Sequence, residues 1–161
     1  MGNELSFDSG LVAIIRTKTA DEARAAATAL ISAGVDVIEF TTTTPAVFDL
    51  IEEFASKTAN TGVHVGLGTA MNRSHVLSGK DAGAKFVISP HVSQEVIEAT
   101  KQAGLISIPG VASPTEVADA LRFGGRYSKI LSGCITWSKL FESSLRTISG
   151  FKLDGHRWHQ R

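Results

Sequence analysis

The sequence contains a single cysteine, Cys134, among its 161 residues. One cysteine excludes an internal disulfide and a zinc site built from cysteines. The histidines at His64, His75 and His91 are not spaced like metal ligands. We therefore expect no bound metal and no other cofactor.

Long apolar runs and an excess of charge of one sign are also missing. No run approaches the roughly 20 apolar residues that a membrane span needs, and the N-terminus lacks the apolar segment of a signal peptide. The formal net charge is zero, and no basic stripe is interleaved with aromatic residues. We expect a cytoplasmic protein that binds neither membranes nor nucleic acid and forms one ordinary domain.

Five glycines each precede a short apolar run rich in β-branched residues. The pairs are Gly10 with LVAIIR, Gly34 with VDVIEF, Gly62 with VHVGLG, Gly83 with AKFVIS and Gly104 with LISIP. Such runs are typical of strands buried on both faces of a parallel sheet, and a glycine before each is expected to end the preceding helix in a left-handed conformation. A further interval of 21 residues ends at Gly125 and predicts a sixth strand over about 126–131, which contains Lys129.

Helix start signals separate the predicted strands. Thr19 to Glu22 and Ser113 to Glu116 have the capping-box pattern, the second with proline at the first helical position. The Thr44-Pro45 pair is expected to open another helix, and Asn72 and Ser93 are expected to begin two more. Strict alternation of strands and helices predicts an α/β fold with a parallel sheet.

The absence of a nucleotide-type glycine fingerprint favours a (β/α)8 barrel of the TIM type over a doubly wound sheet. A closed barrel of this type needs at least about 200 residues. We therefore expect an incomplete barrel with about six of the eight βα units.

Polar residues follow the predicted strands at their carboxyl ends, where barrels build their active sites. The candidate site residues are Arg16, Glu39, Thr43, Thr69, Pro90, Pro109 and Lys129. A carboxylate in an apolar strand end, such as Glu39, is suited to acid–base chemistry because burial raises its pKa. A lysine among apolar strand residues, such as Lys129, is suited to forming a Schiff base. Arg16 is suited to binding a carboxylate or a phosphate.

Each of these residues also has a purely structural interpretation. Glu39 forms a structural ion pair with Arg16 or Lys129 in that interpretation, and Lys129 is a lysine that extends from a strand edge to solvent. Arg16 then makes an ordinary surface salt bridge. Pro90 and Pro109 then only terminate strands.

The chain resembles the aldolases of 2-keto-3-deoxy-6-phosphogluconate (KDPG) and 4-hydroxy-2-oxoglutarate in five segments with the same order and spacing: GLVAIIR, VDVIEFTTTTP, GLGT, FVISPH and IPGVASPTE. The resemblance covers about residues 10–125. It implies a metal-independent class I aldolase, usually a trimer, that cleaves a 2-keto-4-hydroxy acid into pyruvate and an aldehyde such as glyceraldehyde 3-phosphate. The sequence does not decide among KDPG, its galactonate epimer and 4-hydroxy-2-oxoglutarate.

The resemblance also implies a role for each candidate. Glu39 would be the general acid and base, and Lys129 would be the Schiff-base lysine of the sixth strand. Thr69 and Arg16 would contact the carboxylate of the keto acid, and Pro90 and Pro109 would line the pocket. Many relatives carry an arginine where Thr43 stands, and Arg16 would compensate for it in binding the carboxylate.

Residues 126–161 differ from the rest of the chain in composition. They hold seven of the 16 Lys and Arg residues but two of the 16 Asp and Glu residues, together with both tryptophans. The first 125 residues carry a formal charge of −5 and the remainder +5. We therefore divide the chain into a βα-repeat portion over 1–125 and an atypical basic tail over 126–161.

The tail lacks two segments that the resemblance implies, a Phe-x-Pro after the lysine and a Thr-Gly-Gly-Ile strand. The tryptophan codon TGG always yields glycine when it is read one base later, as at Trp137 and Trp158. With permitted codons, residues 154–160 then give Met-Ala-Thr-Gly-Gly-Ile-Asn, and residues 126–132 give Asp-Ile-Val-Lys-Phe-Tyr-Pro. We hypothesise that the tail is an out-of-frame translation of an aldolase gene, and the alternative is a divergent extension.

A chain of this kind lacks the last two barrel strands, which hold phosphate in many barrels, and exposes an open parallel edge. We expect poor stability, association through this edge or aggregation, and little aldolase activity. The alternative function is a catalytically crippled remnant that only associates with other chains.

Overall fold

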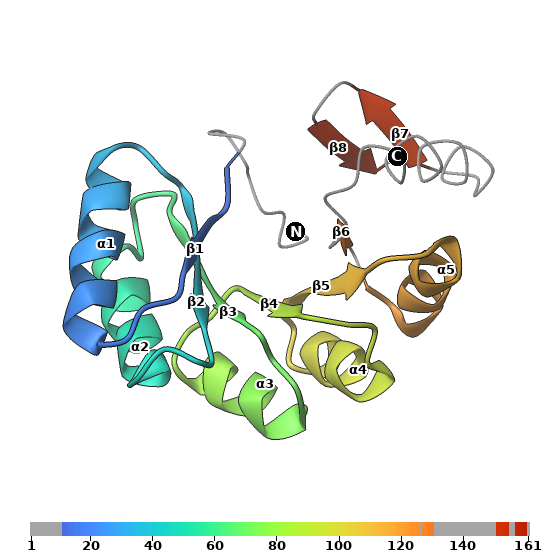
Figure 1. The fold of residues 1–161 in the computed structure, drawn as a ribbon, viewed down its shortest axis with the longest axis horizontal. Coiled ribbons are helices and arrows are strands. Elements are labelled where there is room, and N and C mark those ends of the chain that lie inside the picture. The colour runs from blue at the N-terminus through green and yellow to red at the C-terminus, as the bar shows by residue number, and fades with distance from the viewer. Residues whose placement is uncertain (1–10, 126, 131–150, 155–156, 161) are drawn as a thin grey trace.

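The computed structural model of the chain describes residues 11–125, 127–130, 151–154 and 157–160. Six strands form one sheet in chain order, and all the neighbouring pairs are parallel (Figure 1). The strands are β1 (Ala13–Ile15), β2 (Val37–Thr41), β3 (His64–Gly68), β4 (Phe86–Ser89), β5 (Ile106–Val111) and β6 (Lys129–Ile130). The helices are α1 (Ala20–Ser32), α2 (Val47–Lys57), α3 (Arg73–Asp81), α4 (Gln94–Gln102) and α5 (Pro114–Phe123).

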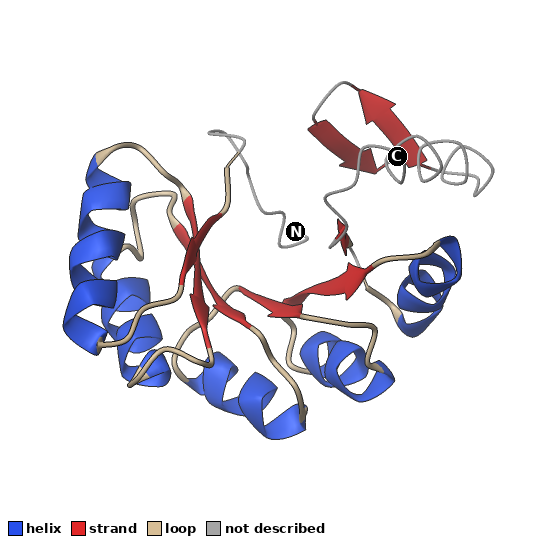
Figure 2. Cartoon of the chain, in the orientation of Figure 1, coloured by secondary structure: helices blue, strands red, loops and turns tan. Residues whose placement is uncertain are grey.

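The winding of the sheet is that of a barrel. The strand order follows the chain without reversal, whereas a doubly wound sheet reverses its order at a switch point. The strands curve into an arc, and the helices lie along its outer side (Figure 2). The predicted α/β fold with a parallel sheet is confirmed, and the structure is an incomplete barrel.

The glycine pattern is confirmed at four positions. Gly34, Gly62, Gly83 and Gly104 have φ angles of 89°, 78°, 91° and 74°, in the left-handed region where a side chain is strained. In the next unit the left-handed residue is Gly124, with φ 99°, and not Gly125 as the interval predicted. Gly10, the first glycine of the pattern, lies outside the described residues.

The predicted helix starts are mostly confirmed. A side-chain oxygen accepts a backbone N–H of the first turn at each of four N-caps: Thr19, Asn72, Ser93 and Ser113. The capping box of α1 is complete. At α5, the carboxylate of Glu116 accepts the N–H of Ala112 instead, at 2.7 Å.

The prediction that Thr44-Pro45 opens a helix is wrong by two residues. Helix α2 begins at Val47, and its N-cap is Ala46 in a left-handed conformation with φ 54°. The Thr44 hydroxyl is 3.3 Å from the carbonyl oxygen of Ile15 and donates to it, which links the ends of β1 and β2. This tertiary contact engages Thr44 in place of a helix cap.

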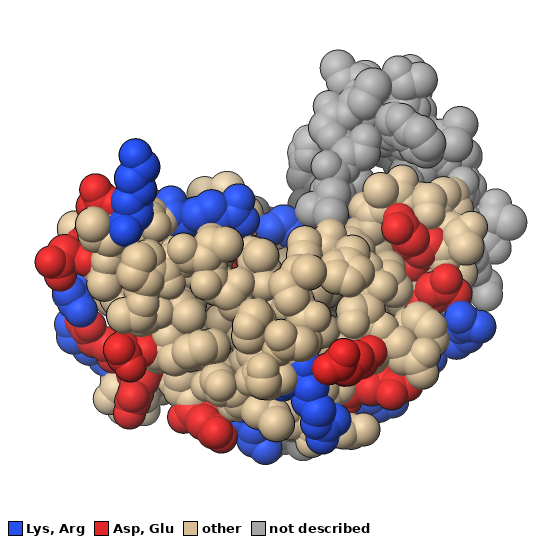
Figure 3. Space-filling view, turned by 60° about the horizontal axis from the view of Figure 1, so that its bottom comes forward, with Lys and Arg blue, Asp and Glu red and all other residues tan. Residues whose placement is uncertain are grey.

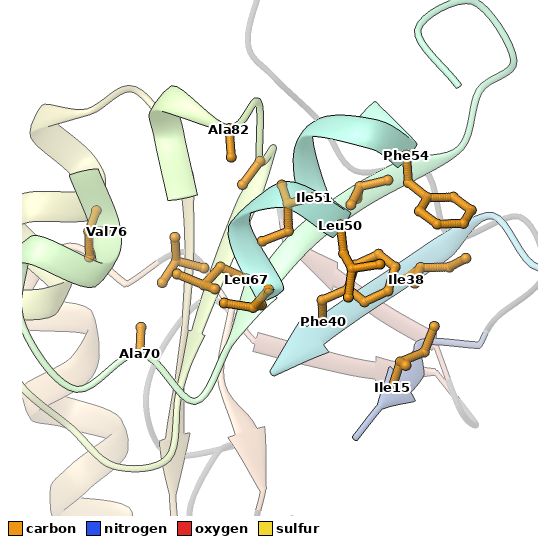
Figure 4. Close-up of a cluster of buried hydrophobic side chains, with 14 of the residues drawn as sticks. Ile15, Ile38, Phe40, Leu50, Ile51, Phe54, Leu67, Ala70, Val76 and Ala82 are labelled. Carbon is orange, nitrogen blue, oxygen red and sulfur yellow. The ribbon is translucent and has the colours of Figure 1, made fainter. Parts of the chain in front are cut away.

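Two apolar clusters lie on opposite faces of the sheet. The larger one fills the space between the strands and the helices, where Phe40, Leu50 and Phe54 pack together (Figure 4). The smaller one faces the inner side of the arc and comprises Val37, Phe86, Ile88, Ile106 and Ile108. Alternate residues of a strand point to opposite faces, so β4 contributes Val87 to the larger cluster and Phe86 and Ile88 to the smaller one.

Charged side chains lie mainly outside these clusters. Acidic and basic residues are interspersed over the described surface on the face shown in Figure 3. Glu53 on α2 pairs with Arg24 at 2.9 Å and with Lys57 at 2.7 Å. Such exposed pairs contribute only about 0–1 kcal/mol, so the two apolar clusters dominate the stability.

Among the described residues that follow β6, no strand joins the parallel sheet. Strands β7 (Phe151–Asp154) and β8 (Arg157–Gln160) form a separate antiparallel pair. None of the helices in the described ranges has the length and apolar character needed to cross a bilayer.

Candidate active site

Glu39 and Lys129 meet although they are 90 residues apart in the sequence. Lys129 Nζ is 3.3 Å from Glu39 Oε2. Glu39 is on β2 and Lys129 is on β6, with three strands between them. The contact therefore joins the two sides of the arc across its inner face. The Glu39 side chain is only 2% exposed, whereas that of Lys129 is 32% exposed.

The two glycines of β3 leave room for this arrangement. A Cβ atom on Gly68 would collide with the carboxylate of Glu39, and one on Gly66 would collide with the ring of Phe86. Residues two apart on a strand share a face, so Gly66 and Gly68 both line the inner side. The GLGT segment thus provides space for the side chains of Glu39 and Phe86.

Gly68→Ala should destabilise the protein and displace the Glu39 carboxylate. Overpacking of this kind costs about 1–3 kcal/mol. Urea denaturation measures the loss. The matched control is Gly79→Ala on α3, where the nearest atom is the flexible Leu67 Cδ2 at 3.0 Å and where alanine favours the helix. Equal stability changes for both variants would contradict this account of Gly68.

Burial raises the pKa of the Glu39 carboxyl above its ordinary value, and the nearby charges of Lys129 and Arg16 oppose this effect. The predicted direction of the shift is confirmed. A carboxyl with a raised pKa holds a proton more readily at neutral pH, which suits a group that must both accept and return a proton.

The raised pKa makes a pH-dependent contribution to stability. Between the ordinary and the raised pKa, the folded state binds more protons at Glu39 than the unfolded state. The contribution is therefore complete below the ordinary value and is lost as the pH rises through the folded pKa.

Glu39→Gln should remove this pH dependence. From pH 4 to pH 8 the native chain should lose stability relative to this variant. The loss in the free energy of unfolding should be about 1.4 kcal/mol for each unit by which the pKa of Glu39 is raised. Urea denaturation of both proteins across this range measures the difference. Parallel pH curves would refute the assignment.

Arg16 and Thr69 lie close together at the same end of the sheet. Arg16 directly follows β1, and its Nη2 is 3.4 Å from Thr69 Oγ1. The charge of Arg16 also acts on Glu39. The hydroxyl of Thr43 is exposed on the neighbouring loop and lies 2.9 Å from that of Thr41. Glu39, Lys129, Arg16 and Thr69 therefore form one polar group. Arg16 and Thr69 directly follow β1 and β3, whereas Glu39 is the middle residue of β2 and Lys129 is the first residue of β6.

The two prolines are placed differently from each other. Pro90 directly follows β4, as expected for a residue that ends a strand. Pro109 lies inside β5, so the interpretation that it ends a strand is wrong. Its ring lies near Gly125 and faces away from the inner cluster that contains Ile108. Pro109 therefore lies on the face of β5 opposite to Ile108.

Sequence reasoning did not single out Thr42, which hydrogen-bonds to Thr69, or the steric role of Gly68. The spacing of Gly66 and Gly68 was a usable signal, because it places both glycines on one face of a strand. Among the described residues, no cluster of three or more His, Cys, Asp or Glu side chains is arranged to hold a metal ion.

The parallel sheet, with its strands in chain order and its helices along the outer side, defines a protein of the TIM-barrel type. A family model described as "KDPG and KHG aldolase" matches residues 4–141. The chain belongs to the KDPG and KHG aldolase family, whose members are carbon–carbon lyases.

Individual relatives agree with this assignment. A probable 2-dehydro-3-deoxy-6-phosphogalactonate aldolase of Rhizobium meliloti is 35% identical over 114 residues, which is 71% of this chain and 53% of that protein. The solved structure titled "Native KDPGal structure" has a TM-score of 0.79 at 26% identity and covers 92% of this chain and 70% of its own.

A third relative was solved with a bound reaction intermediate. The KDPG aldolase of Legionella pneumophila, with pyruvate captured as a covalent carbinolamine, has a TM-score of 0.73 at 28% identity. The match covers 82% of this chain and 65% of that one. This chain spans about half the length of the curated relatives it matches.

Proposed function

We propose that this chain carries the site of a Schiff-base aldolase that cleaves KDPG or a related 2-keto-4-hydroxy acid to pyruvate and an aldehyde. The observation that carries the proposal is the contact between the buried Glu39 carboxylate and the Lys129 amine, 3.3 Å apart. A proton acceptor beside a lysine is what carbinolamine chemistry requires. The Legionella relative, with its covalent pyruvate carbinolamine, supports the same chemistry here.

Lys129 attacks the C2 ketone in its neutral form, so its proton must first move to a neighbouring group. Glu39 is within reach of that proton. The new C–N bond gives a carbinolamine, which loses water to form a protonated Schiff base. The positive nitrogen then serves as an electron sink.

Cleavage follows from the same pair of residues. Glu39 accepts the proton of the C4 hydroxyl, and the C3–C4 bond breaks. The aldehyde leaves with C4, and the electron pair of the broken bond forms the enamine of pyruvate. Protonation at C3 and addition of water then release pyruvate and regenerate the Lys129 amine.

The keto acid carboxylate has a cationic partner in Arg16, with Thr69 beside it at 3.4 Å. A guanidinium binds a carboxylate through two parallel hydrogen bonds. Because Thr43 has no charge, Arg16 supplies the positive charge at this position. KDPG, its galactonate epimer and 4-hydroxy-2-oxoglutarate differ from one another in the rest of the molecule, away from this carboxylate. The proposal covers all three.

The second candidate function is a non-catalytic remnant that associates with other chains. The observation that favours it is the extent of the parallel sheet, which has six strands in the described part of the chain. Strands β7 and β8 pair only with each other. The family resemblance also predicts a homo-oligomer, a trimer. Light scattering on the purified chain measures the oligomeric state.

Borohydride trapping with pyruvate tests the aldolase proposal. We expect a mass increase on the peptide that contains Lys129 and no increase in a Lys129→Met variant. Lys85→Met, which changes an exposed lysine next to β4, should trap pyruvate like the native chain. A soluble native chain that neither traps pyruvate nor cleaves any of the three keto acids would favour the remnant.

A further inference from the structure

Thr69 adopts a backbone conformation that threonine rarely adopts. Its φ angle is 59°, in the left-handed region, and it directly follows β3. A β-branched side chain is a genuine outlier in this region, and such outliers persist only where the surrounding structure enforces them. Ala46 is the other residue besides glycine with a positive φ in the described part of the chain.

Three hydrogen bonds hold the backbone on both sides of Thr69. The Thr42 N–H donates to the carbonyl of Gly68 at 2.9 Å, and the Thr42 hydroxyl donates to the carbonyl of Thr69 at 2.8 Å. The N–H of Ala70 donates to the carbonyl of Ile88 at 3.0 Å. Thr42 therefore supplies two of the three bonds, one of them through its side chain.

This conformation determines where the Thr69 hydroxyl lies. The chain turns at Thr69 and does not continue along β3, and its Oγ1 lies 3.4 Å from Arg16 Nη2. If β3 continued in extended form, Thr69 would share the face of Leu67, opposite to that of Gly68 and Glu39. The strained backbone of Thr69 thus occurs where its hydroxyl lies beside Arg16. Both groups are suited to binding the same carboxylate.

We propose that Thr42 is a positioning residue: its hydroxyl holds Thr69 in the left-handed conformation and thereby keeps the Thr69 hydroxyl beside Arg16 for binding the carboxylate of the keto acid. The inference rests on the proposed aldolase function and adds to it a residue that does not touch the substrate.

Thr42→Val tests this role, because valine keeps the shape and removes the hydroxyl. The pyruvate concentration for half-maximal borohydride trapping should rise about five- to tenfold, the ratio that corresponds to one lost hydrogen bond. The trapping rate at saturating pyruvate should stay within about twofold. Thr42→Ser retains the hydroxyl and should restore the native half-saturation.

The matched control is Thr100→Val on α4. Thr100 is buried, whereas Thr42 is half-buried, and the Thr100 hydroxyl donates to the carbonyl of Val96 at 2.7 Å within its own helix. This variant should lower Tm without moving the half-saturation. A native half-saturation in Thr42→Val, or an equal rise in Thr100→Val, would overturn the proposal.

A comparison at Thr69 tests the geometry without using activity. Thr69→Gly and Thr69→Ala both remove the hydroxyl, but only glycine relieves the strain of a positive φ. We expect Tm to be about 2–4 °C higher for the glycine variant. An equal or lower Tm would overturn the strained geometry. A native chain that traps no pyruvate would overturn the proposed function, and this Tm comparison would still decide the geometry.

Discussion

Replacing Glu39 with glutamine should reduce the cleavage rate by about 10²- to 10⁴-fold, the range expected for loss of a general acid–base group. The amide cannot accept the proton of the C4 hydroxyl, so the C3–C4 bond remains intact. Lys129 is retained, and the pyruvate adduct should still form, although more slowly. Cleavage assays and borohydride trapping on the same preparation separate these two effects.

The matched control is Glu53→Gln. Glu53 is also a carboxylate in an ion pair, but it lies on α2 and pairs with Arg24 and Lys57 on the outer surface. Its loss should leave both cleavage and trapping unchanged. A Glu39→Gln protein that cleaves at the native rate would remove Glu39 from the mechanism.

Restoring the reading frame after codon 125 should have an equally large effect. The hypothesis is that residues 126–161 are translated one base out of frame, and the corrected chain would recover the Phe-x-Pro and Thr-Gly-Gly-Ile segments. We expect the native chain to show little turnover and a strong tendency to associate. The corrected chain should cleave the keto acid with measurable turnover and unfold at a higher Tm.

The expected deficiency would arise at the last strand of the parallel sheet. Among the described residues, β6 comprises Lys129 and Ile130, and β7 and β8 form their own antiparallel pair. An open parallel edge exposes unpaired backbone groups to other chains. Completing the sheet would cover that edge, which explains the higher expected Tm.

Sequencing the coding DNA across codons 120–161 is the direct measurement. Codons that are incompatible with the shifted segments would refute the hypothesis. If the codons are compatible, a corrected chain carrying methionine in place of Lys129 is the control for turnover, because it restores the barrel without the amine.

Local signals in the sequence predicted most of the secondary structure. Glycines such as Gly34 and Gly83 mark helix ends because a left-handed backbone strains any other residue. Side chains such as Thr19 mark helix starts because they bond to the free N–H groups of the first turn. Both signals act over a few residues, so they are readable in one sequence. The glycine interval predicted Gly125, but the left-handed residue is Gly124, so this signal locates a helix end to within about one residue.

Tertiary contacts overrode these local signals in three places. Thr44 has the composition of a helix cap, but its hydroxyl bonds to the carbonyl of Ile15. Pro109 is expected to end a strand, but it lies inside β5. Thr69 is a residue typical of strands, but it turns the chain in a left-handed conformation. In each case the partner is distant in the sequence, namely Ile15 for Thr44, Ser89 for Pro109 and Thr42 for Thr69, and its position depends on the whole sheet.

The sequence by itself determined the alternation of strands and helices, the identity of the polar residues that follow the strands, and the family resemblance. Only the tertiary structure brought Glu39 and Lys129 to 3.3 Å, because their contact depends on the curvature of a sheet with three strands between them. Only the tertiary structure revealed Gly68 beneath Glu39 and Thr42 beside Thr69. Curvature and inter-strand register arise from packing over the whole sheet, and no short stretch of sequence encodes them.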